Sequence, residues 1–248
     1  MIVEYHRPST VAQALGLLSR SNPPTYPLGG GSVLSRKKGE DFAVVDLQNL
    51  KLGMIQSETD QLVIGATAYI QDLTENENSP AWLRNVCRRE MGRNLRQMST
   101  IGGFLMCANG RSSLAVTLLA ADVQAIILPD NTPLSFQQIL AVRENVRQPW
   151  LISQVVLDTS CTVKFEFIAR SPVDLPILGI ATAKWPSGRM RVVVGGFGSA
   201  PRLAYDGNAE IEISRAVESV LQDSGDEWAS AEYRRSVAPA VVNRLLQS

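Results

Sequence analysis

The sequence has one histidine and three cysteines in 248 residues. A single histidine, His6, provides no Ser-His-Asp set, and a lone histidine near a terminus is far more often a surface or packing residue than a catalyst. Cys87, Cys107 and Cys161 form no CxxC pair, no zinc-ligand spacing and no disulfide framework, so we expect three reduced thiols in a cytoplasmic protein. Three cysteines are also fewer than the four ligands of one iron–sulfur cluster.

An excess of charge of either sign is also missing, since 24 basic residues balance 24 acidic ones. A net charge of zero gives no general attraction to nucleic acid or to an acidic membrane. The longest apolar runs are short pieces such as AIIL and VVVGGF, far below the roughly 20 residues of a membrane span. The N-terminal residues MIVEYHRPST show no basic segment followed by an apolar one, so we expect no signal peptide.

What the sequence does contain is a succession of short strand and helix patterns that is typical of an α+β fold. We expect a small β-α-β unit by about residue 50, with a helix after the N-cap Ser9 and a buried strand at 42–47. Further along, strands are expected at 61–66 and 151–158, and helices at 79–91 and 112–122, with Thr67 able to cap another helix.

From residue 161 the pattern changes to strand, strand, strand, helix, helix. The strands are expected at 161–170, 176–185 and 190–197, the last two as a hairpin, and the helices at 209–223 and 230–247. We therefore expect two domains, residues 1–158 and residues 161–248. The second is a small α+β domain built on a three-stranded antiparallel sheet.

Two glycine-rich loops carry the clearest hint of function: Gly29-Gly30-Gly31-Ser32 and STIGGF at 99–104. Neither has the GxGxxG pattern or the Gly-Lys-Ser/Thr of a phosphate-binding loop, and each alone is more often a plain turn than a ligand site. Together, their backbone N–H groups could hold a pyrophosphate from two sides without a lysine. One shared site requires the two loop backbones to lie within about 15 Å, given hydrogen bonds of roughly 3 Å.

The motifs occur in a recognisable order. LGGGSVL (28–34) is followed by VVDLQNL (44–50), IGATAYIQDL (64–73) and RNLRQMSTIGGFL (93–105), and then by FIARSPVDLPIL, VVVGGFGSAPRL and ASAEYRRSVAPAVVNRLL (229–246). This set resembles the FAD-binding subunits of the molybdenum hydroxylases, the family of carbon monoxide dehydrogenase and xanthine dehydrogenase. The resemblance covers nearly the whole chain.

That resemblance implies a two-lobed FAD-binding domain of the PCMH/VAO type at 1–158. At 161–248 it implies a C-terminal domain like that of the carbon monoxide dehydrogenase flavoprotein. It implies FAD as the cofactor, with the two loops on its pyrophosphate and a leucine backing the flavin. The expected cofactor-binding residues are Leu28, Gly29, Gly30, Gly31, Ser32, Val33, Leu34, Thr100, Ile101, Gly102, Gly103 and Leu151. No catalytic or metal-binding residue is expected.

The function that the resemblance implies is that of an electron-transfer oxidoreductase subunit in a hetero-oligomer. A partner large subunit would hold the molybdenum cofactor and a partner small subunit the [2Fe–2S] clusters. The flavin would pass electrons from those clusters to an external acceptor. One candidate contact surface is the terminal 232–235 stretch. The other is a helix face whose arginines could equally be solvated, and these arginines are Arg84, Arg88, Arg89, Arg93 and Arg96.

Three positions depart from the family pattern. Phe104 replaces an asparagine, Ser113 replaces an aspartate that usually contacts the cofactor, and Glu166 replaces a lysine often found near the flavin. Phenylalanine cannot donate the hydrogen bonds of an amide, and a glutamate opposes negative charge on a flavin. These departures favour an alternative, a flavin-free structural subunit of the same kind of complex. A stand-alone flavin reductase of similar fold fits less well, because the terminal helix pattern belongs to the complex-forming family.

Overall fold

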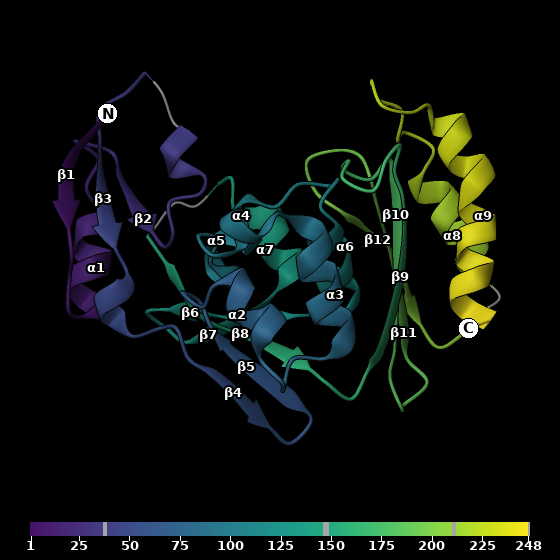
Figure 1. Ribbon diagram of the computed structural model, residues 1–248, viewed down its shortest axis with the longest axis horizontal. Helices are drawn as coiled ribbons and strands as arrows, with labels where there is room; N and C mark the ends of the chain where they lie inside the picture. The colour runs from purple at the N-terminus through teal and green to yellow at the C-terminus, as the bar shows by residue number, and fades with distance from the viewer. Residues whose placement is uncertain (37–38, 146–148, 210–211, 248) are drawn as a thin grey trace. The chain divides into compact units, whose positions relative to one another are not determined.

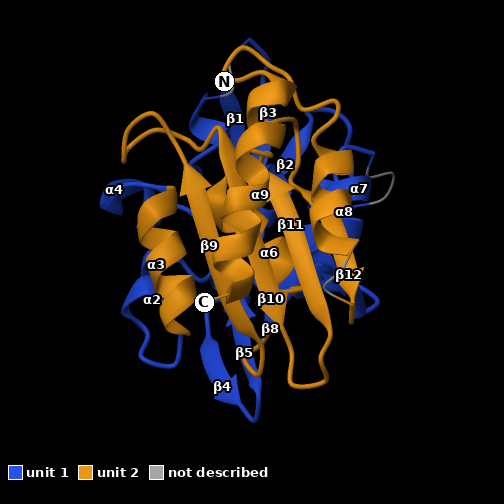
Figure 2. Ribbon diagram, turned by 90° about the vertical axis from the view of Figure 1, so that its right-hand side faces the viewer, with its two compact units in different colours: residues 1–79, 91–107, 124–157 blue, residues 80–90, 108–123, 158–248 orange. Residues whose placement is uncertain are grey.

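A computed structural model describes residues 1–36, 39–145, 149–209 and 212–247 of the chain (Figure 1). Contacts between residues divide it into two compact units, which Figure 2 colours separately. Unit 1 comprises residues 1–79, 91–107 and 124–157, and unit 2 comprises residues 80–90, 108–123 and 158–248. The chain therefore passes from one unit to the other several times.

Unit 1 begins with a three-stranded parallel sheet of order β1-β3-β2. Its strands are β1 (Ile2–His6), β2 (Thr25–Leu28) and β3 (Phe42–Asp46), with helix α1 (Val11–Leu18) between the first two. The central strand β3 is buried at all five positions, as expected for a parallel strand covered on both faces. The expected β-α-β unit is therefore present, although Thr10 rather than Ser9 caps α1, by accepting a hydrogen bond from the Gln13 N–H.

The second sheet of unit 1 has five strands in the order β4-β5-β8-β6-β7. They are β4 (Ile55–Glu58), β5 (Gln61–Gly65), β6 (Gln124–Leu128), β7 (Thr132–Ser135) and β8 (Leu151–Asp158). The accompanying helices are α2 (Ile70–Glu75), α4 (Arg93–Arg96), α5 (Ile101–Cys107) and α7 (Phe136–Val142), with short 3-10 turns η1 (Leu34–Arg36) and η2 (Gln48–Leu50). Helix α2 starts after Tyr69, whose N–H donates to Asp72, and not after Thr67 as the sequence suggests.

Unit 2 is built on an antiparallel sheet of order β12-β11-β10-β9. The strands are β9 (Thr162–Ile168), β10 (Leu178–Lys184), β11 (Met190–Gly195) and β12 (Arg202–Gly207). The antiparallel arrangement and the β10–β11 hairpin are as expected, but the expected number of three strands is wrong. The sequence does not reveal β12, because this edge strand is only partly buried and its residues RLAYDG lack a clear apolar alternation.

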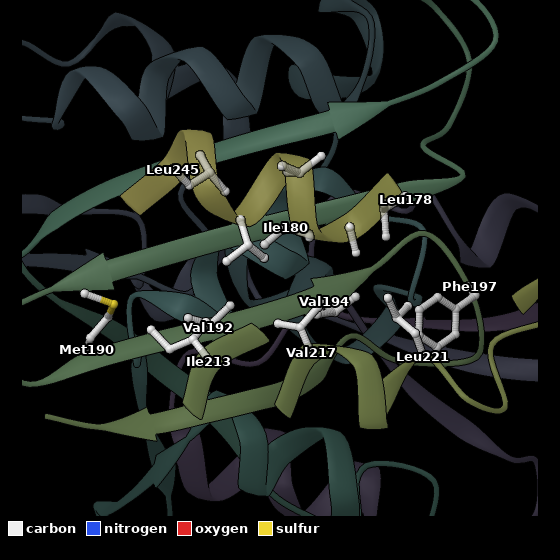
Figure 3. Packing of buried hydrophobic residues seen from close by; sticks show 13 residues of the cluster. Leu178, Ile180, Met190, Val192, Val194, Phe197, Ile213, Val217, Leu221 and Leu245 are labelled. Atoms are coloured by element: carbon white, nitrogen blue, oxygen red, sulfur yellow. The ribbon is translucent and has the colours of Figure 1, made fainter. Parts of the chain in front are cut away.

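Helices cover both faces of the unit 2 sheet. Gly195 leaves room for Val116 of α6 (Ser113–Ala120), which packs on one face and is itself contacted by α3 (Ala81–Glu90). On the opposite face, Leu178 and Ile180 join a core with α8 (Ile213–Val220) and α9 (Ala231–Gln247), as Figure 3 shows. Alternate residues of one strand point to opposite faces, so β10 serves both layers.

Helices α3 and α6 come from the first expected domain but pack in unit 2. All eight residues of α6 are buried, and a helix that is apolar all round requires cover on every side. The unit 2 sheet supplies part of that cover. The last passage between units lies at residues 157 and 158, next to the expected boundary. As units of homology, domains 1–158 and 161–248 stay predictions.

The expected contact surface at 232–235 is wrong for Arg234, which is completely buried in unit 2. Its guanidinium donates hydrogen bonds to the main-chain carbonyl oxygens of Ile177, Gly196, Ser224 and Ala229 and forms an ion pair of 2.9 Å with Asp226. Five N–H donors in a planar fork suit several acceptors at once, which explains an arginine inside the protein. The exposed Arg235 remains part of the candidate surface.

The five arginines expected on one helix face lie on two helices, because the chain bends at Met91 and Gly92. Three belong to α3 in unit 2 and two to α4 in unit 1. The Arg89 guanidinium lies 5.3 Å from the centre of the Phe167 ring, and the Arg96 Nε donates to Gln71 at 2.8 Å. The five arginines therefore do not form one continuous helical surface.

A glutamate at the end of α3 caps the buried helix α6. The Glu90 carboxylate accepts a hydrogen bond from the Leu114 N–H at 2.8 Å, and the Ser113 N–H and Ser112 hydroxyl also bond to it. Desolvation nevertheless raises the Glu90 pKa above its ordinary value of 4.5, against the lowering effect of these hydrogen bonds. In the folded protein, Glu90 thus holds its proton to a higher pH than in the unfolded chain.

This raised pKa predicts a pH-dependent contribution to stability. Between pH 4.5 and the raised pKa, the native state binds more protons than the unfolded state, so the free energy of unfolding falls as pH rises. We expect that in Glu90→Gln the free energy of unfolding no longer shows this decrease with rising pH. The measurement is urea denaturation of both proteins across that pH range. Identical slopes in the two proteins would contradict the prediction, whereas carboxylates with lowered pKa values, such as Asp206, affect both alike.

Among the described residues, no helix is both long enough and apolar enough to cross a membrane.

Candidate functional site

The first glycine loop leaves β2 in unit 1 and turns sharply. The Leu28 carbonyl oxygen accepts a hydrogen bond from the Leu47 N–H at 3.1 Å, which ends the pairing with β3. Gly31 then has φ of +74°, a left-handed conformation that favours glycine. The Ser35 N–H donates to the Gly31 carbonyl oxygen at 3.0 Å and closes the turn into η1. The three consecutive glycines therefore form a tight bend at the end of a buried sheet.

The second loop is bound to the segment that follows β5. The Ile101 N–H donates to the Ala68 carbonyl oxygen and the Gly102 N–H to that of Ala66, both at 2.9 Å. The Ala66 N–H in turn donates to the Ser153 carbonyl oxygen of β8 at 2.9 Å. A side chain at Gly102 would lie 2.9 Å from the Ala66 Cβ, so this backbone approach needs glycine. The loop is thus fixed against the five-stranded sheet.

The two loops touch each other, which confirms the expectation that they lie close together. A Cβ atom added to Gly29 would lie 2.6 Å from the Thr100 Oγ1. A Cβ atom added to Gly30 would lie 1.4 Å from the Met98 carbonyl oxygen, a distance no pair of unbonded atoms can adopt. Gly30 is therefore needed for the packing of one loop on the other.

A cavity of about 250 Å³ opens where the loops meet, within unit 1. Seven of the expected cofactor-binding residues line it: Gly29, Val33, Leu34, Thr100, Gly102, Gly103 and Leu151. Five do not: Leu28, Gly30, Gly31, Ser32 and Ile101. Ile101 is in the core with 1% of its surface exposed, and Gly30 packs on Met98. Ile101 thus anchors the second loop in the core, and Gly30 lets the first loop pack on the second.

Nine lining residues were not singled out from the sequence: Tyr26, Pro27, Leu47, Ala66, Thr67, Met106, Cys107, Trp150 and Ile152. Some are neighbours of predicted residues, as Trp150 is of Leu151, and Cys107 follows Gly103 by one turn of α5. Among the described residues, none that lines this cavity carries a charge. Desolvation raises the pKa of the Cys107 thiol, which keeps it protonated and neutral although the residue as a whole is exposed.

A second, more polar cavity of about 360 Å³ shares Gly29 and Thr67 with the first. Lys51 and Asp72 bring one charge of each sign to its wall. The Asp72 carboxylate also accepts a hydrogen bond from the Tyr69 N–H at 2.9 Å, so it is fixed at the start of α2. The two cavities therefore adjoin at Gly29 and Thr67, one with an uncharged lining and the other with a charged one.

The loops differ in the hydrogen-bond donors that they offer to a ligand. No described residue accepts a hydrogen bond from the main-chain N–H groups of residues 29–33. In the second loop, by contrast, the N–H groups of Ile101 and Gly102 are already bonded, and that of Gly103 donates to the Thr100 Oγ1 at 3.3 Å. Consecutive free N–H groups form a concave anion site. An anion would thus be held by the first loop and by the Thr100 hydroxyl, not by amides of both loops.

Comparison with known families now identifies the fold around this site. Residues 1–137 match the family model described as the FAD binding domain in molybdopterin dehydrogenase. The chain belongs to this family. The match includes both glycine loops of the molybdopterin dehydrogenase FAD-binding domain and confirms the resemblance seen in the motif order. FAD is therefore the cofactor of the family to which the chain belongs.

Individual relatives agree with this assignment. The Uncharacterized protein YgfM of Escherichia coli (strain K12) is 28% identical over 255 residues, which cover 99% of this chain and 95% of that protein. Quinoline 2-oxidoreductase from Pseudomonas putida 86 contains a chain with a TM-score of 0.78 and 18% identity, covering 98% of this chain and 95% of that one. Reconstituted CO dehydrogenase from Oligotropha carboxidovorans contains a chain with a TM-score of 0.79 and 20% identity, covering 98% of this chain and 96% of that one. The fold of these two solved chains is thus shared along 98% of this chain.

The described residues fit the pyrophosphate of FAD, a dianion, on two observations. The first is the set of unbonded N–H groups at 29–33, and the second is the lack of a side chain at Gly29, which lets this backbone lie close to the Thr100 hydroxyl. Hydrogen bonds from backbone N–H groups to an anion are stronger than those between neutral groups.

The three departures from the pattern of the molybdopterin dehydrogenase FAD domain have structural roles of their own. Phe104 is in the core, with 8% of its surface exposed, and does not line the cavity. Ser113 is buried at the start of α6, where its N–H bonds to Glu90. The Glu166 carboxylate accepts a hydrogen bond from the Arg244 Nε at 2.9 Å, which pairs β9 with α9 within unit 2. Glu166 is therefore held in an ion pair.

Proposed function

We propose that this chain is the FAD-binding electron-transfer subunit of a molybdenum-containing hydroxylase or dehydrogenase complex in the cytoplasm. Electrons would come from [2Fe–2S] clusters in a small partner subunit, and substrate would be oxidised at the molybdenum cofactor of a large partner subunit. The flavin-bearing subunit would deliver the electrons to an external acceptor. The observation that carries the proposal is the row of unbonded N–H groups at residues 29–33 beside the cavity, in a chain of this family.

The role of the chain's own residues would be to bind and orient FAD. FAD, when bound, supplies the redox chemistry, and the protein tunes and positions it. The N–H groups of residues 29–33 and the Thr100 hydroxyl would hold the pyrophosphate, and Leu151 would form part of the apolar wall. Lys51 and Asp72 bring one charge of each sign to the adjoining polar cavity. The neutral Cys107 thiol leaves the apolar cavity without a negative charge.

The need for partners follows from the cysteines. Cys87, Cys107 and Cys161 are free thiols, and no group of three or more possible ligands among the described residues could hold a metal ion. An iron–sulfur cluster needs four ligands, so electrons must reach the flavin from another chain. The exposed Arg235 and the arginines of α3 and α4 are the candidate contact residues.

The test is a mild affinity purification from the native source followed by a visible absorption spectrum. We expect one large and one small partner subunit to accompany the chain. The spectrum should show flavin bands near roughly 370 and 450 nm, which belong to the cofactor. Recovery of the chain alone, still reducing an acceptor with its own substrate, would rule out the partner requirement. Molybdenum and iron content of the purified material identifies the partners.

A flavin-free structural subunit is the second candidate, and one observation favours it. The amides of Ile101 and Gly102, which the family resemblance assigns to the pyrophosphate, are bonded to Ala68 and Ala66. This candidate predicts a complex with molybdenum and iron but without flavin, and no flavin uptake when FAD is added to the purified chain. Titration of the chain with FAD therefore separates the two candidates.

A further inference from the structure

A third cavity, of about 510 Å³, lies in unit 2 and takes no part in the proposed flavin site. It is formed by β9, β10, the turn after β10 and the last described residues of α9. Its volume falls within the roughly 300–1,000 Å³ of small-molecule sites. The cavity begins where the apolar core of Figure 3 ends, because Leu245 belongs to both.

The floor of this cavity is an alternating set of lysines and threonines on one face of the sheet. Thr162 lies directly opposite Lys184, and Lys164 directly opposite Thr182, in the antiparallel register of β9 and β10. Directly opposite residues have Cβ atoms about 4.5–5.5 Å apart, so the four side chains adjoin. Two lysine and two threonine side chains thus lie next to one another on one face of the sheet.

The two central side chains of the floor are not used by the protein. Thr182 has only 5% of its surface exposed, lines the cavity, and its hydroxyl makes no hydrogen bond with any described residue. The half-buried Lys164 likewise forms no ion pair within the described part of the chain. Both groups line the cavity and are therefore available to a molecule bound in it.

The rim of the cavity is apolar and rigid. Trp185 is fixed by a hydrogen bond of 2.9 Å from its Nε1 to Asp158 and by the Arg189 guanidinium 4.9 Å from its ring centre. Pro186 and Leu246 complete the rim. Fixed aromatic and apolar walls above a polar floor favour a ligand with one anionic end and one apolar or flat part.

We propose that this cavity binds a small anionic molecule whose phosphate or carboxylate group meets Lys164 and Thr182, and whose flat or apolar part lies against Trp185. The Lys164 ammonium group neutralises the anion, and the Thr182 hydroxyl donates to it. Charged hydrogen bonds of this kind are the strong ones. The site lies within unit 2 and is independent of whether unit 1 holds flavin.

The test is a titration of the full chain, observed at the Trp185 indole N–H by nuclear magnetic resonance. The signal is assigned by its loss in Trp185→Phe. The probes are inorganic pyrophosphate, adenosine 5′-monophosphate and phthalate. We expect saturable shifts with at least one of the two flat probes, and their relative affinity distinguishes a phosphate from a carboxylate ligand. Pyrophosphate alone, without a flat part, should bind more weakly than the better flat probe.

Lys164→Gln should weaken this binding by about tenfold, since one charged hydrogen bond contributes roughly that factor. Thr182→Val, which keeps the shape of the side chain, should weaken it by a smaller factor. The control is Arg215→Gln, which removes a positive charge from an exposed site on α8 and should leave affinity unchanged. Absence of saturable binding below about 10 mM, or equal losses in Lys164→Gln and Arg215→Gln, would overturn the proposal.

Discussion

Arg234→Met should lower the free energy of unfolding by about 3–5 kcal/mol, because it leaves the buried carbonyl oxygens and Asp226 without their donor. The guanidinium of Arg234 bonds to β10, β11 and the segment before α9 through Ile177, Gly196 and Ser224. Burial raises the Asp226 pKa, but the hydrogen bonds from Arg234 and from the Ala229 and Trp228 N–H groups together outweigh it, so the pKa is lowered overall. Removing the arginine takes away the largest of these lowering effects. Typical domains are stable by only about 5–15 kcal/mol, so the loss is a large fraction.

The measurement is urea denaturation followed by circular dichroism, and the matched control is Arg235→Met. Arg235 is the next residue of α9 but is exposed, so its replacement should change stability by less than about 0.5 kcal/mol. Arg234→Lys should also be destabilised, because a single ammonium group cannot reach acceptors on several sides. Equal stability of Arg234→Met and Arg235→Met would show that the buried hydrogen bonds contribute nothing net.

Gly30→Ala should remove bound flavin from the chain. The added methyl would lie 1.4 Å from the Met98 carbonyl oxygen, so the first loop must move away from the second. That movement displaces the N–H groups of residues 29–33 from the anion. Loss of even one or two charged hydrogen bonds, at about 1.5–3 kcal/mol each, weakens binding roughly a hundredfold. From sequence alone, Gly30→Asp is the natural test on grounds of charge, whereas the structure predicts that a methyl group is sufficient.

Flavin content per chain, read from the absorption spectrum, checks this prediction. The control is Gly16→Ala in the middle of α1, where a Cβ atom meets nothing within 4 Å. Alanine is favoured over glycine inside a helix, so this variant should keep its flavin and gain up to about 1 kcal/mol of stability. Unchanged flavin content in a folded Gly30→Ala protein would contradict the proposed position of the pyrophosphate.

The sequence predicted the contact between the loops because a short glycine run next to a Ser or Thr is a local pattern that a family shares. It did not predict the atoms that meet there, since the partner of Gly30 is a main-chain oxygen of Met98, and any residue could supply that. The sequence also did not show which N–H groups of the loops are bonded. The acceptors of the Ile101 and Gly102 N–H groups, Ala68 and Ala66, lie some 35 residues earlier in the chain.

Burial of Arg234 was missed for a different reason. Arginine is among the residues least often buried, and only the convergence of carbonyl oxygens from distant segments makes this site favourable. The fourth strand of unit 2 was missed because an edge strand has a weak apolar pattern. The apolar helix at 112–122 was correctly expected, yet nothing in its own residues shows which sheet covers it.

That separation in sequence affects how the protein is made. Helix α6 ends at Ala120, whereas the sheet that covers it begins at Thr162 and ends at Gly207. A ribosome that adds about 5–20 residues per second needs several seconds to cover that distance. Throughout that time, α6 has been synthesised but the sheet that covers it has not. The nascent chain is thus most exposed to aggregation, and most dependent on chaperones, while residues 121–207 are being synthesised. Slower translation after residue 120 would prolong this period.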